Sequence, residues 1–197
     1  MRYNKTHKSK TRKRIIETLA SRFLEHGITG GDLASLMGDV GLTRGGFYYH
    51  FESKDELIRE AVAYAWKRSL EQLRGIENTT DDGLASLVDK YLEVLPGRRE
   101  INAIAMAALS GEVARESLAL REVFGSGTRQ VIDLIGGQLR KGDSADRRRQ
   151  VSMAVLATLV GALSLARAIS DPNTADQLLV SARWAAFTLA EASAADH

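Results

Sequence analysis

Apolar residues recur along this chain with the three- and four-residue spacing of amphipathic helices. No segment alternates apolar and polar residues for long, so no strand is expected. The class predicted is all-α. Beyond residue 52 the pattern predicts helices over residues 53–66 and onward, 82–95, 102–115, 116–140, 144–169 and 174–192. Four glycines in the stretch 116–140 indicate a kink or a break near a cavity, and a capping box of Thr174 and Gln177 is expected to start the last helix.

The shortest predicted helix follows a turn at Gly41. Apolar positions over residues 32–40 predict one helix, and Gly41 can end it in the left-handed conformation. Thr43 can then cap a second helix of about two turns, on which Phe47 and Phe51 face a core. Two helices joined in this way predict a helix-turn-helix.

Gly45 and Gly46 stand near the start of that short helix. Each costs about 1 kcal/mol relative to alanine within a helix. Their presence indicates that the backbone must stay bare there, as close approach to a phosphate backbone or a base edge would require. The alternative is that the two glycines only relieve packing between two helices.

Charge is concentrated at the amino terminus, although the chain of 197 residues has a net charge of only +2. Residues 1–14 contain basic side chains and no acidic one: Arg2, Lys5, Lys8, Lys10, Arg12, Lys13 and Arg14. Such a basic segment is suited to phosphate binding, and a merely solvated tail is the alternative. Beside a helix-turn-helix, the phosphate-binding interpretation is favoured.

Other classes of protein are disfavoured. Basic residues at the start lead into a charged helix instead of an apolar run, so no secretory signal is expected and the protein is predicted to be cytoplasmic. The apolar stretch 151–166 is shorter than the roughly 20 residues of a membrane span, so no membrane partner is expected. The four histidines show no metal-ligand or acid–base spacing, and no nucleotide-binding glycine motif is present. No enzyme activity, metal or cofactor is therefore predicted. The absence of cysteine excludes disulfides and thiol chemistry.

Residues 10–60 resemble the DNA-binding domain of the TetR family of bacterial one-component regulators. The resemblance rests on Thr-Arg-Lys-Arg-Ile at residues 11–15, the Phe23 to Gly27 spacing, the Gly-Leu-Thr turn at 41–43, Phe-Tyr-Tyr-His-Phe at 47–51 and Ser-Lys-Asp-Glu-Leu at 53–57. The chain departs from the family at Gly31-Asp32, where Thr-Ser or Thr-Thr is usual.

The resemblance implies an amino-terminal three-helix helix-turn-helix domain, residues 1–52, and a carboxy-terminal helical domain for effector binding and dimerisation, residues 53–197. It implies a homodimer on a palindromic double-stranded DNA operator, in which the last two helices form a four-helix bundle across a two-fold axis. Packing of both helices within one chain is the alternative. In this picture Arg44 donates twice to a guanine edge. Groove and phosphate contacts are carried over to Thr43, Tyr48, Tyr49, His50 and Lys54, with close approach at Gly45 and Gly46.

A small-molecule effector of unknown identity is expected in the second domain. The predicted pocket residues combine apolar lining with a few polar groups: Trp66, Tyr91, Asn102, Met106, Phe124 and Gln130. Each of them is alternatively plain core. The function predicted is therefore a ligand-responsive transcriptional regulator, expected to be a repressor. The alternative is a helical DNA-binding protein or activator without a small-molecule sensor.

Overall fold

A computed structural model describes residues 2–28, 37–38, 40–41, 43–75, 83–92, 104–140 and 142–192. All regular structure in these segments is helical, which confirms the predicted all-α class. The helices, in chain order, are α1 (Arg2–His26), α3 (Arg44–His50), α4 (Lys54–Arg74), α5 (Gly83–Leu92), α6 (Ile104–Val113), α7 (Leu118–Gln138), α8 (Ala145–Ala168) and α9 (Pro172–Ala192). Most of the helix predicted over residues 32–40 lies outside the described residues.

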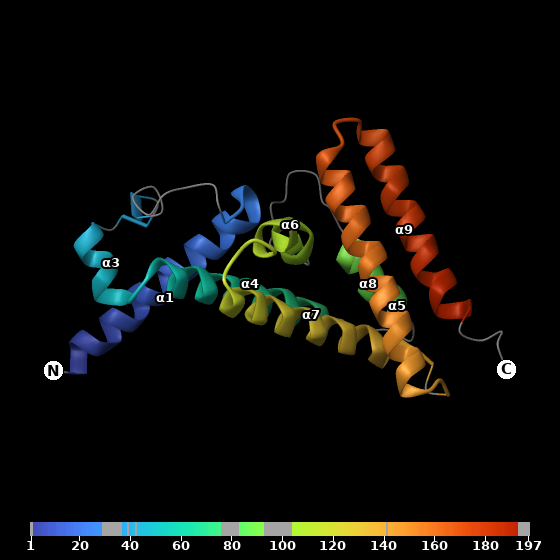
Figure 1. The fold of residues 1–197 in the computed structure, drawn as a ribbon, viewed down its shortest axis with the longest axis horizontal. Helices are drawn as coiled ribbons and strands as arrows, with labels where there is room; N and C mark the ends of the chain where they lie inside the picture. The colour runs from blue at the N-terminus through green and yellow to red at the C-terminus, as the bar shows by residue number, and fades with distance from the viewer. Residues whose placement is uncertain are drawn as a thin grey trace.

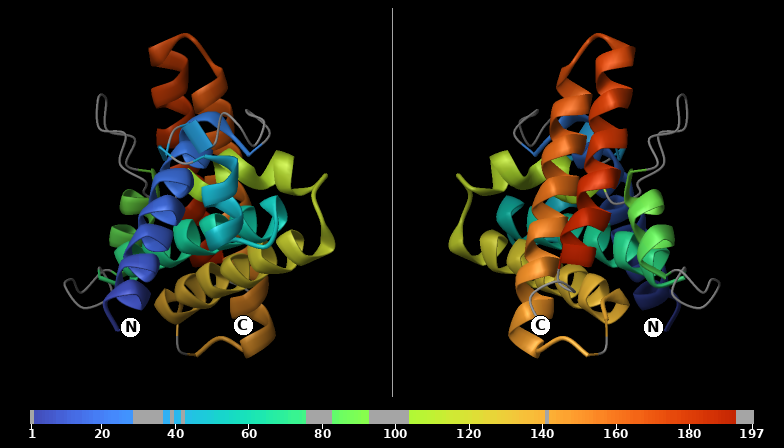
Figure 2. Two further views of the ribbon diagram at one scale, coloured as in Figure 1. Left: turned by 90° about the vertical axis from the view of Figure 1, so that its left-hand side faces the viewer. Right: turned by 90° about the vertical axis from the view of Figure 1, so that its right-hand side faces the viewer.

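The helices form an elongated molecule with two different ends (Figure 1). At one end α3 lies beside α1 and the start of α4. At the other end α8 and α9 form a pair (Figure 1, Figure 2). Between them α4 packs first on α1 and then on α7, so it belongs to both halves of the molecule. The domain boundary at residue 52 remains a prediction.

Local signals in the sequence explain the short helix α3. Gly41 has φ of +67°, so it supplies the predicted left-handed turn. The hydroxyl of Thr43 accepts from the backbone N–H of Gly46 at 3.2 Å and caps the helix. Phe47 and Phe51 are fully buried, with their rings stacked 5.7 Å apart, and they hold one face of the helix against the core. The predicted cap and anchors are confirmed.

Helix α4 begins at a reciprocal cap. The hydroxyl of Ser53 accepts from the backbone N–H of Glu56 at 3.1 Å. The carboxylate of Glu56 accepts in return, from the N–H of Glu52 at 2.6 Å, one residue earlier than in a standard capping box. Behind this cap a stripe of apolar residues is buried along the helix, from Leu57 to Leu73.

Helix α7 is continuous from Leu118 to Gln138, so the break predicted from its glycines is wrong and the kink stays a prediction. Gly127 instead permits close packing. A β-carbon at this position would lie 2.1 Å from the indole of Trp66 on α4. The bare backbone lets the two helices approach across a large aromatic ring, and Phe124 completes the contact edge-on to the indole.

The last two helices begin at different kinds of cap. Ser144 caps α8, because its hydroxyl accepts from the N–H of Arg147 at 3.2 Å. The Thr174 and Gln177 capping box is wrong, because the carboxylate of Asp171 accepts from the backbone N–H of Thr174 at 3.0 Å and Pro172 opens α9. Aspartate followed by proline is a favourable helix start, since proline at the first position needs no N–H partner.

Helix α8 is 24 residues long with a mean hydropathy of 1.8 over its most apolar window. By length and composition it is the one helix in the described part of the chain that could cross a membrane, so the expectation that it is too short is wrong. A buried helix of a folded domain meets the same criteria. Helix α8 packs against α6, α7 and α9, and 39% of that window is buried within the described chain.

Candidate nucleic-acid interface

Helix α3 presents two tyrosines to solvent from the end of the molecule. Tyr48 is 56% exposed and Tyr49 is 53% exposed, whereas Phe47 between them and the core is fully buried. The left view of Figure 2 shows α3 on the outer side of this end, next to α1. A seven-residue helix that buries one face and offers the other is free to meet a partner with that second face.

The two glycines of α3 lie in its first turn. No heavy atom of the described residues lies within 4 Å of the position that a β-carbon would take at Gly45. The alternative that the glycines relieve packing between two helices stays open, because most of the preceding helix lies outside the described residues. Gly46 donates its N–H to the cap at Thr43. The exposed backbone at Gly45 can therefore approach an external surface closely.

His50 ends α3 in a basic environment. Its Nδ1 is buried and has no hydrogen-bond partner among the described residues. Burial lowers the pKa of His50, and the charges of Lys8 and Arg12 lower it further. Lys8 also lies 4.2 Å from the centre of the Tyr49 ring, in cation–π geometry. The basic segment thus reaches the exposed face of α3.

The remaining predicted contact residues lie at helix starts. Thr43 is exposed while it caps α3, and Lys54 is exposed at the first position of α4. Arg44 is the first residue of α3, and its side chain lies outside the described part of the structure. The structure therefore gathers Thr43, Gly45, Gly46, Tyr48, Tyr49, His50 and Lys54 on α3 and its flanks.

The basic segment 2–14 is not a tail, because it forms the first half of α1. Arg12 within it is partly buried and lies toward α3 and α4. Its guanidinium donates to the carbonyl of His50 at 3.2 Å, to the carboxylate of Glu56 at 2.8 Å and to that of Glu60 at 2.6 Å. It also lies 4.6 Å from the centre of the Phe51 ring. The hydrogen bond to Glu60 raises the pKa of Arg12. The inclusion of Arg12 among phosphate-binding side chains stays a prediction, and in this structure the guanidinium is paired with carboxylates of α4.

We call Arg12, Glu56 and Glu60 the arginine cluster. Sequence reasoning missed it because the arginine is 44 and 48 residues away from its partners. One signal was present: Glu56 and Glu60 are four residues apart, so they share a face of α4. Two carboxylates on one face of α4 are typical of a face that meets a cation or solvent, and the sequence does not decide between the two.

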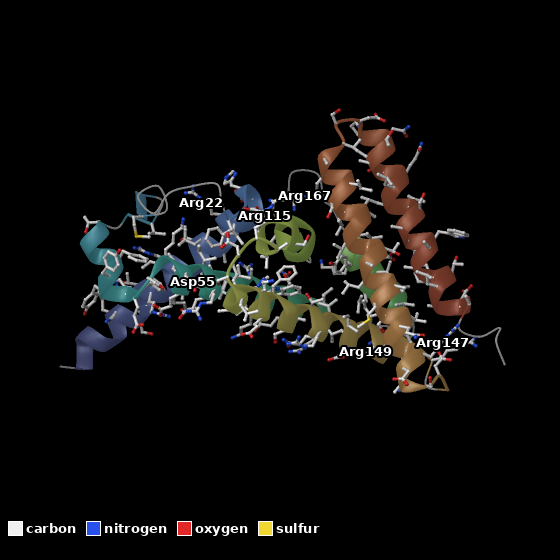
Figure 3. The ribbon with its side chains drawn as sticks, viewed as in Figure 1. Arg22, Asp55, Arg115, Arg147, Arg149 and Arg167 are labelled. Carbon is white, nitrogen blue, oxygen red and sulfur yellow. The ribbon has the colours of Figure 1, made fainter. Side chains whose placement is uncertain are left out.

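Further polar contacts join the two halves of the molecule. The hydroxyl of Ser117, which caps α7, donates to the carboxylate of Asp55 at 3.0 Å. Asp55 lies where α4 begins, close to the start of α7 (Figure 3). Arg167 near the end of α8 donates to the carbonyl of Leu24 in α1 at 3.4 Å. A shift of α7 would therefore change a contact with α4, and a shift of α8 would change a contact with α1.

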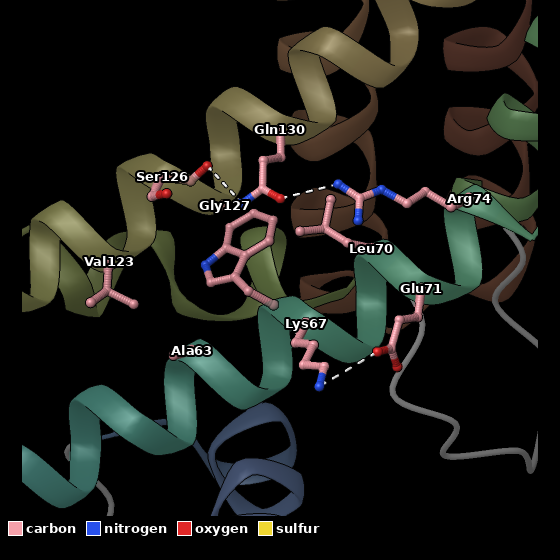
Figure 4. A pocket seen from close by; sticks show the side chains of 10 residues that line it. Ala63, Lys67, Leu70, Glu71, Arg74, Val123, Ser126, Gly127 and Gln130 are labelled. Carbon is pink, nitrogen blue, oxygen red and sulfur yellow. Dashed lines mark hydrogen bonds and ion pairs between the residues drawn. The ribbon is translucent and has the colours of Figure 1, made fainter.

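A groove of about 390 Å³ lies between α4 and α7 (Figure 4). Its lining combines apolar side chains with a charged rim: Ala63, Trp66, Lys67, Leu70, Glu71, Arg74, Val123, Ser126, Gly127 and Gln130. Arg74 donates to the side-chain carbonyl of Gln130 at 3.2 Å across the groove. The Nε1 of Trp66 is buried and has no partner within the described segments.

The groove brings together part of the predicted pocket. Trp66 and Gln130 line it, and Phe124 contacts Trp66 with ring centres 5.3 Å apart. Tyr91 on α5 is 2% exposed and does not line the groove. Asn102 and the side chain of Met106 lie outside the described residues. The missed lining residues follow helical spacing on two facing helices, but nothing in the sequence pairs those helices.

The exposed short helix and the larger body behind it define an all-α protein with an amino-terminal helix-turn-helix unit. The family model for "Bacterial regulatory proteins, tetR family" matches residues 15–61. The "Probable acrEF/envCD operon repressor" of Escherichia coli K12 is 39% identical over 51 residues, which are 26% of this chain and 23% of that protein. The "HTH-type transcriptional repressor BepR" of Brucella suis biovar 1 is 32% identical over 65 residues, which are 33% of this chain and 31% of that protein. The matches thus span less than a third of these curated relatives.

Solved structures share the fold over most of the chain. The reduced form of E. coli NemR has a TM-score of 0.74 at 21% identity and covers 88% of this chain and 95% of that one. A TetR-family regulator from Agrobacterium tumefaciens has a TM-score of 0.74 at 16% identity, covering 90% and 98%. Residues 15–61 thus match the TetR family of bacterial regulatory proteins in sequence, and the chain has the fold that solved TetR-family regulators share.

Proposed function

We propose that the protein is a ligand-responsive repressor of transcription that binds double-stranded DNA as a homodimer in the cytoplasm. The observation that carries the proposal is the exposed face of α3, where Tyr48 and Tyr49 lie beside Lys8 and the bare backbone of Gly45. Aromatic and basic groups on a capped helix suit a DNA groove and its phosphates. The repressor names of the relatives support the direction of regulation.

Within this proposal α3 enters the major groove. Arg44 donates to a guanine edge, since the first residues of such a helix are the ones that contact bases. Thr43, Tyr48, Tyr49, His50 and Lys54 contact the groove wall and phosphates, and Gly45 and Gly46 allow the backbone to come close. No catalytic role is assigned to any residue.

The dimer is proposed to form through α8 and α9. Large apolar side chains on these helices are exposed in the single chain: Met153, Leu165, Val180 and Trp184, the last at 70%. Only Ala182 and Ala186 of α9 are buried within the chain. The right view of Figure 2 shows the two helices side by side on the outer surface, at the end opposite α3. A second copy that packs there would bury this surface in a four-helix bundle.

The effector is proposed to bind in the groove between α4 and α7. Its volume is in the range of small-molecule sites. The buried indole N–H of Trp66 gives a ligand a hydrogen-bond donor that the protein itself does not satisfy within the described residues. Lys67, Arg74 and Gln130 on the rim add polar groups that fix orientation.

The test begins with selection of duplexes from a randomised pool, with sedimentation of the complex. We expect an enriched inverted repeat bound by two copies, with half-sites about 34–36 Å apart or a multiple of it. Trp184→Glu should give a monomer that binds the selected duplex more weakly, whereas Arg129→Glu, at an exposed position of α7, should not. Failure to enrich any duplex would refute DNA recognition.

The effector proposal has its own test. A compound that binds in the groove can be detected by the fluorescence of Trp66 in a Trp184→Phe background, and it should weaken binding to the selected duplex roughly 5- to 150-fold.

A further inference from the structure

Helix α3 is too short to hold its own position. It has seven residues, and isolated helices shorter than about 12–15 residues are marginal in water. Its amino-terminal end is capped by Thr43. At its carboxy-terminal end the carbonyls need partners from elsewhere in the molecule. The side chain of Arg12 on α1 supplies one, because its Nε donates to the carbonyl of His50 at 3.2 Å.

The rest of the same guanidinium is committed to α4. Nη2 donates to Glu56 at 2.8 Å and to Glu60 at 2.6 Å, and Nη1 pairs with the other oxygen of Glu60. Four of the five N–H groups of an arginine are thereby used. The two carboxylates also offset its charge, so Arg12 is poorly suited to hold a DNA phosphate as well.

The arginine cluster extends into the turn between α3 and α4. The second oxygen of Glu56 accepts from the backbone N–H of Glu52 at 2.6 Å, within that turn. The guanidinium also lies 4.6 Å from the centre of the ring of Phe51, the C-cap residue of α3. One side chain of α1 thus contacts the end of α3 and the first two turns of α4, and through Glu56 it is linked to the turn between them.

We propose that Arg12 is a positioning residue for DNA recognition: it fixes the angle of α3 against α1 and α4 and makes no phosphate contact itself. This inference rests on the proposed DNA binding. It predicts that the loss of Arg12 impairs recognition of sequence while general attraction to DNA remains. A phosphate contact would behave in the opposite way, since it strengthens binding to all sequences and adds to the salt dependence.

The experiment compares Arg12→Gln, Arg12→Lys and the control Lys54→Gln. Affinity is measured by fluorescence anisotropy across a salt series, for the selected duplex and for a scrambled duplex of equal composition. We expect Arg12→Gln to lose about 5- to 150-fold on the selected duplex, the equivalent of one or more lost base contacts. Its affinity for the scrambled duplex and its salt slope should stay as in the wild type. Lys54→Gln should weaken both duplexes and flatten the slope by about 0.9.

Arg12→Lys separates charge from geometry. Lysine keeps the positive charge but lacks the planar fork that serves three acceptors at once. We therefore expect it to fail as Arg12→Gln fails. Full recovery with lysine, a flattened slope in Arg12→Gln, or equal loss on both duplexes would overturn the proposal.

A measurement without DNA tests the positioning directly. Hydrogen exchange of the amides at residues 47–51 should be faster in Arg12→Gln, while exchange in α8 and α9 is unchanged. Glu60→Gln removes a partner on α4 and should show the same pattern more weakly, so it serves if Arg12→Gln does not fold. Unchanged exchange at residues 47–51 in a folded variant would overturn the inference. If no duplex is enriched, the proposed function fails, and this exchange measurement still decides whether Arg12 positions α3.

Discussion

Gly127→Ala tests the packing that joins α4 to α7. Alanine in place of glycine within a helix ordinarily stabilises by about 1 kcal/mol. At this position the new methyl carbon would lie 2.1 Å from one indole carbon of Trp66 and 2.5 Å from two others. Trp66 is 4% exposed and its ring is held edge-on by Phe124. The methyl group therefore cannot be accommodated unless the indole or the helix moves.

The expected magnitude is the sum of two opposed effects. Overpacking of a core costs about 1–3 kcal/mol, and the gain in helix propensity offsets about 1 kcal/mol of it. The net change in the free energy of unfolding at Gly127 is then a loss of about 0–2 kcal/mol. Gly125→Ala is the matched control on the same helix, because its nearest contact would be the end of the Arg129 side chain at an ordinary 3.5 Å. That variant should gain about 1 kcal/mol.

The assay is urea and thermal denaturation of the two variants beside the wild type. They should differ by about 1–3 kcal/mol, which is roughly 2–12 °C in Tm for a chain of this size. The fluorescence of Trp66, measured in a Trp184→Phe background, should change in Gly127→Ala only. Equal stabilisation by the two substitutions would refute the reasoning, because it would show that the indole does not press on Gly127.

Three further predictions concern single groups in the described structure. The pKa of His50 in the folded protein is lowered from 6.5, first by burial and then by charges that include Lys8. As the pH falls, His50 is therefore protonated in the unfolded chain before it is protonated in the folded one. The free energy of unfolding should decrease as the pH falls from about 6.5 through the lowered folded-state pKa. Urea titrations of the wild type and His50→Gln check this, and the same pH dependence in both would contradict it. Thr43→Ala removes the acceptor for the N–H of Gly46 and should cost about 1 kcal/mol of stability, whereas Thr43→Ser should retain it. Tyr91→Phe removes a buried hydroxyl that has no hydrogen-bond partner among the described residues. The substitution should leave the free energy of unfolding unchanged or raise it by up to about 1 kcal/mol. A clearly lower denaturation midpoint would show that the hydroxyl has a partner outside the described residues.

The parts of the fold that sequence predicted are those set by neighbours in the chain. Thr43 and Ser53 each cap a backbone N–H three residues ahead, and Gly41 turns the chain by its own conformation. Such features need no knowledge of the rest of the molecule. The helix positions followed from periodicity for the same reason. The start of α9 was misassigned because Asp171 and Thr174 are both suitable caps, and proline after Asp171 decided between them.

The parts that sequence missed depend on contacts between distant segments. Arg12 has the same side chain as its basic neighbours, and only the fold shows that it faces Glu56 and Glu60. Gly127 was interpreted as a helix breaker, because the sequence does not distinguish a glycine that interrupts a helix from one that makes room for a neighbouring side chain. Periodicity gives the face of a helix but not the partner of that face.

Helix α4 connects the two proposed sites through rigid contacts at both ends. Glu56 lies in the arginine cluster that holds α3, and Trp66, ten residues or about 15 Å further along, forms part of the groove against α7. A ligand can weaken DNA binding only by its differential affinity for two positions of this helix. The indole of Trp66 lies close against the backbone of Gly127, and both residues line the groove. A ligand in the groove that displaces the indole would therefore change the packing of α4 against α7. At the other end the guanidinium of Arg12 bonds α4 and α3 together, so a shift of α4 carries α3 with it. Loss of Arg12 should therefore reduce the response to ligand as well as recognition of sequence, because the same side chain that sets the angle of α3 also transmits the movement of α4 to it.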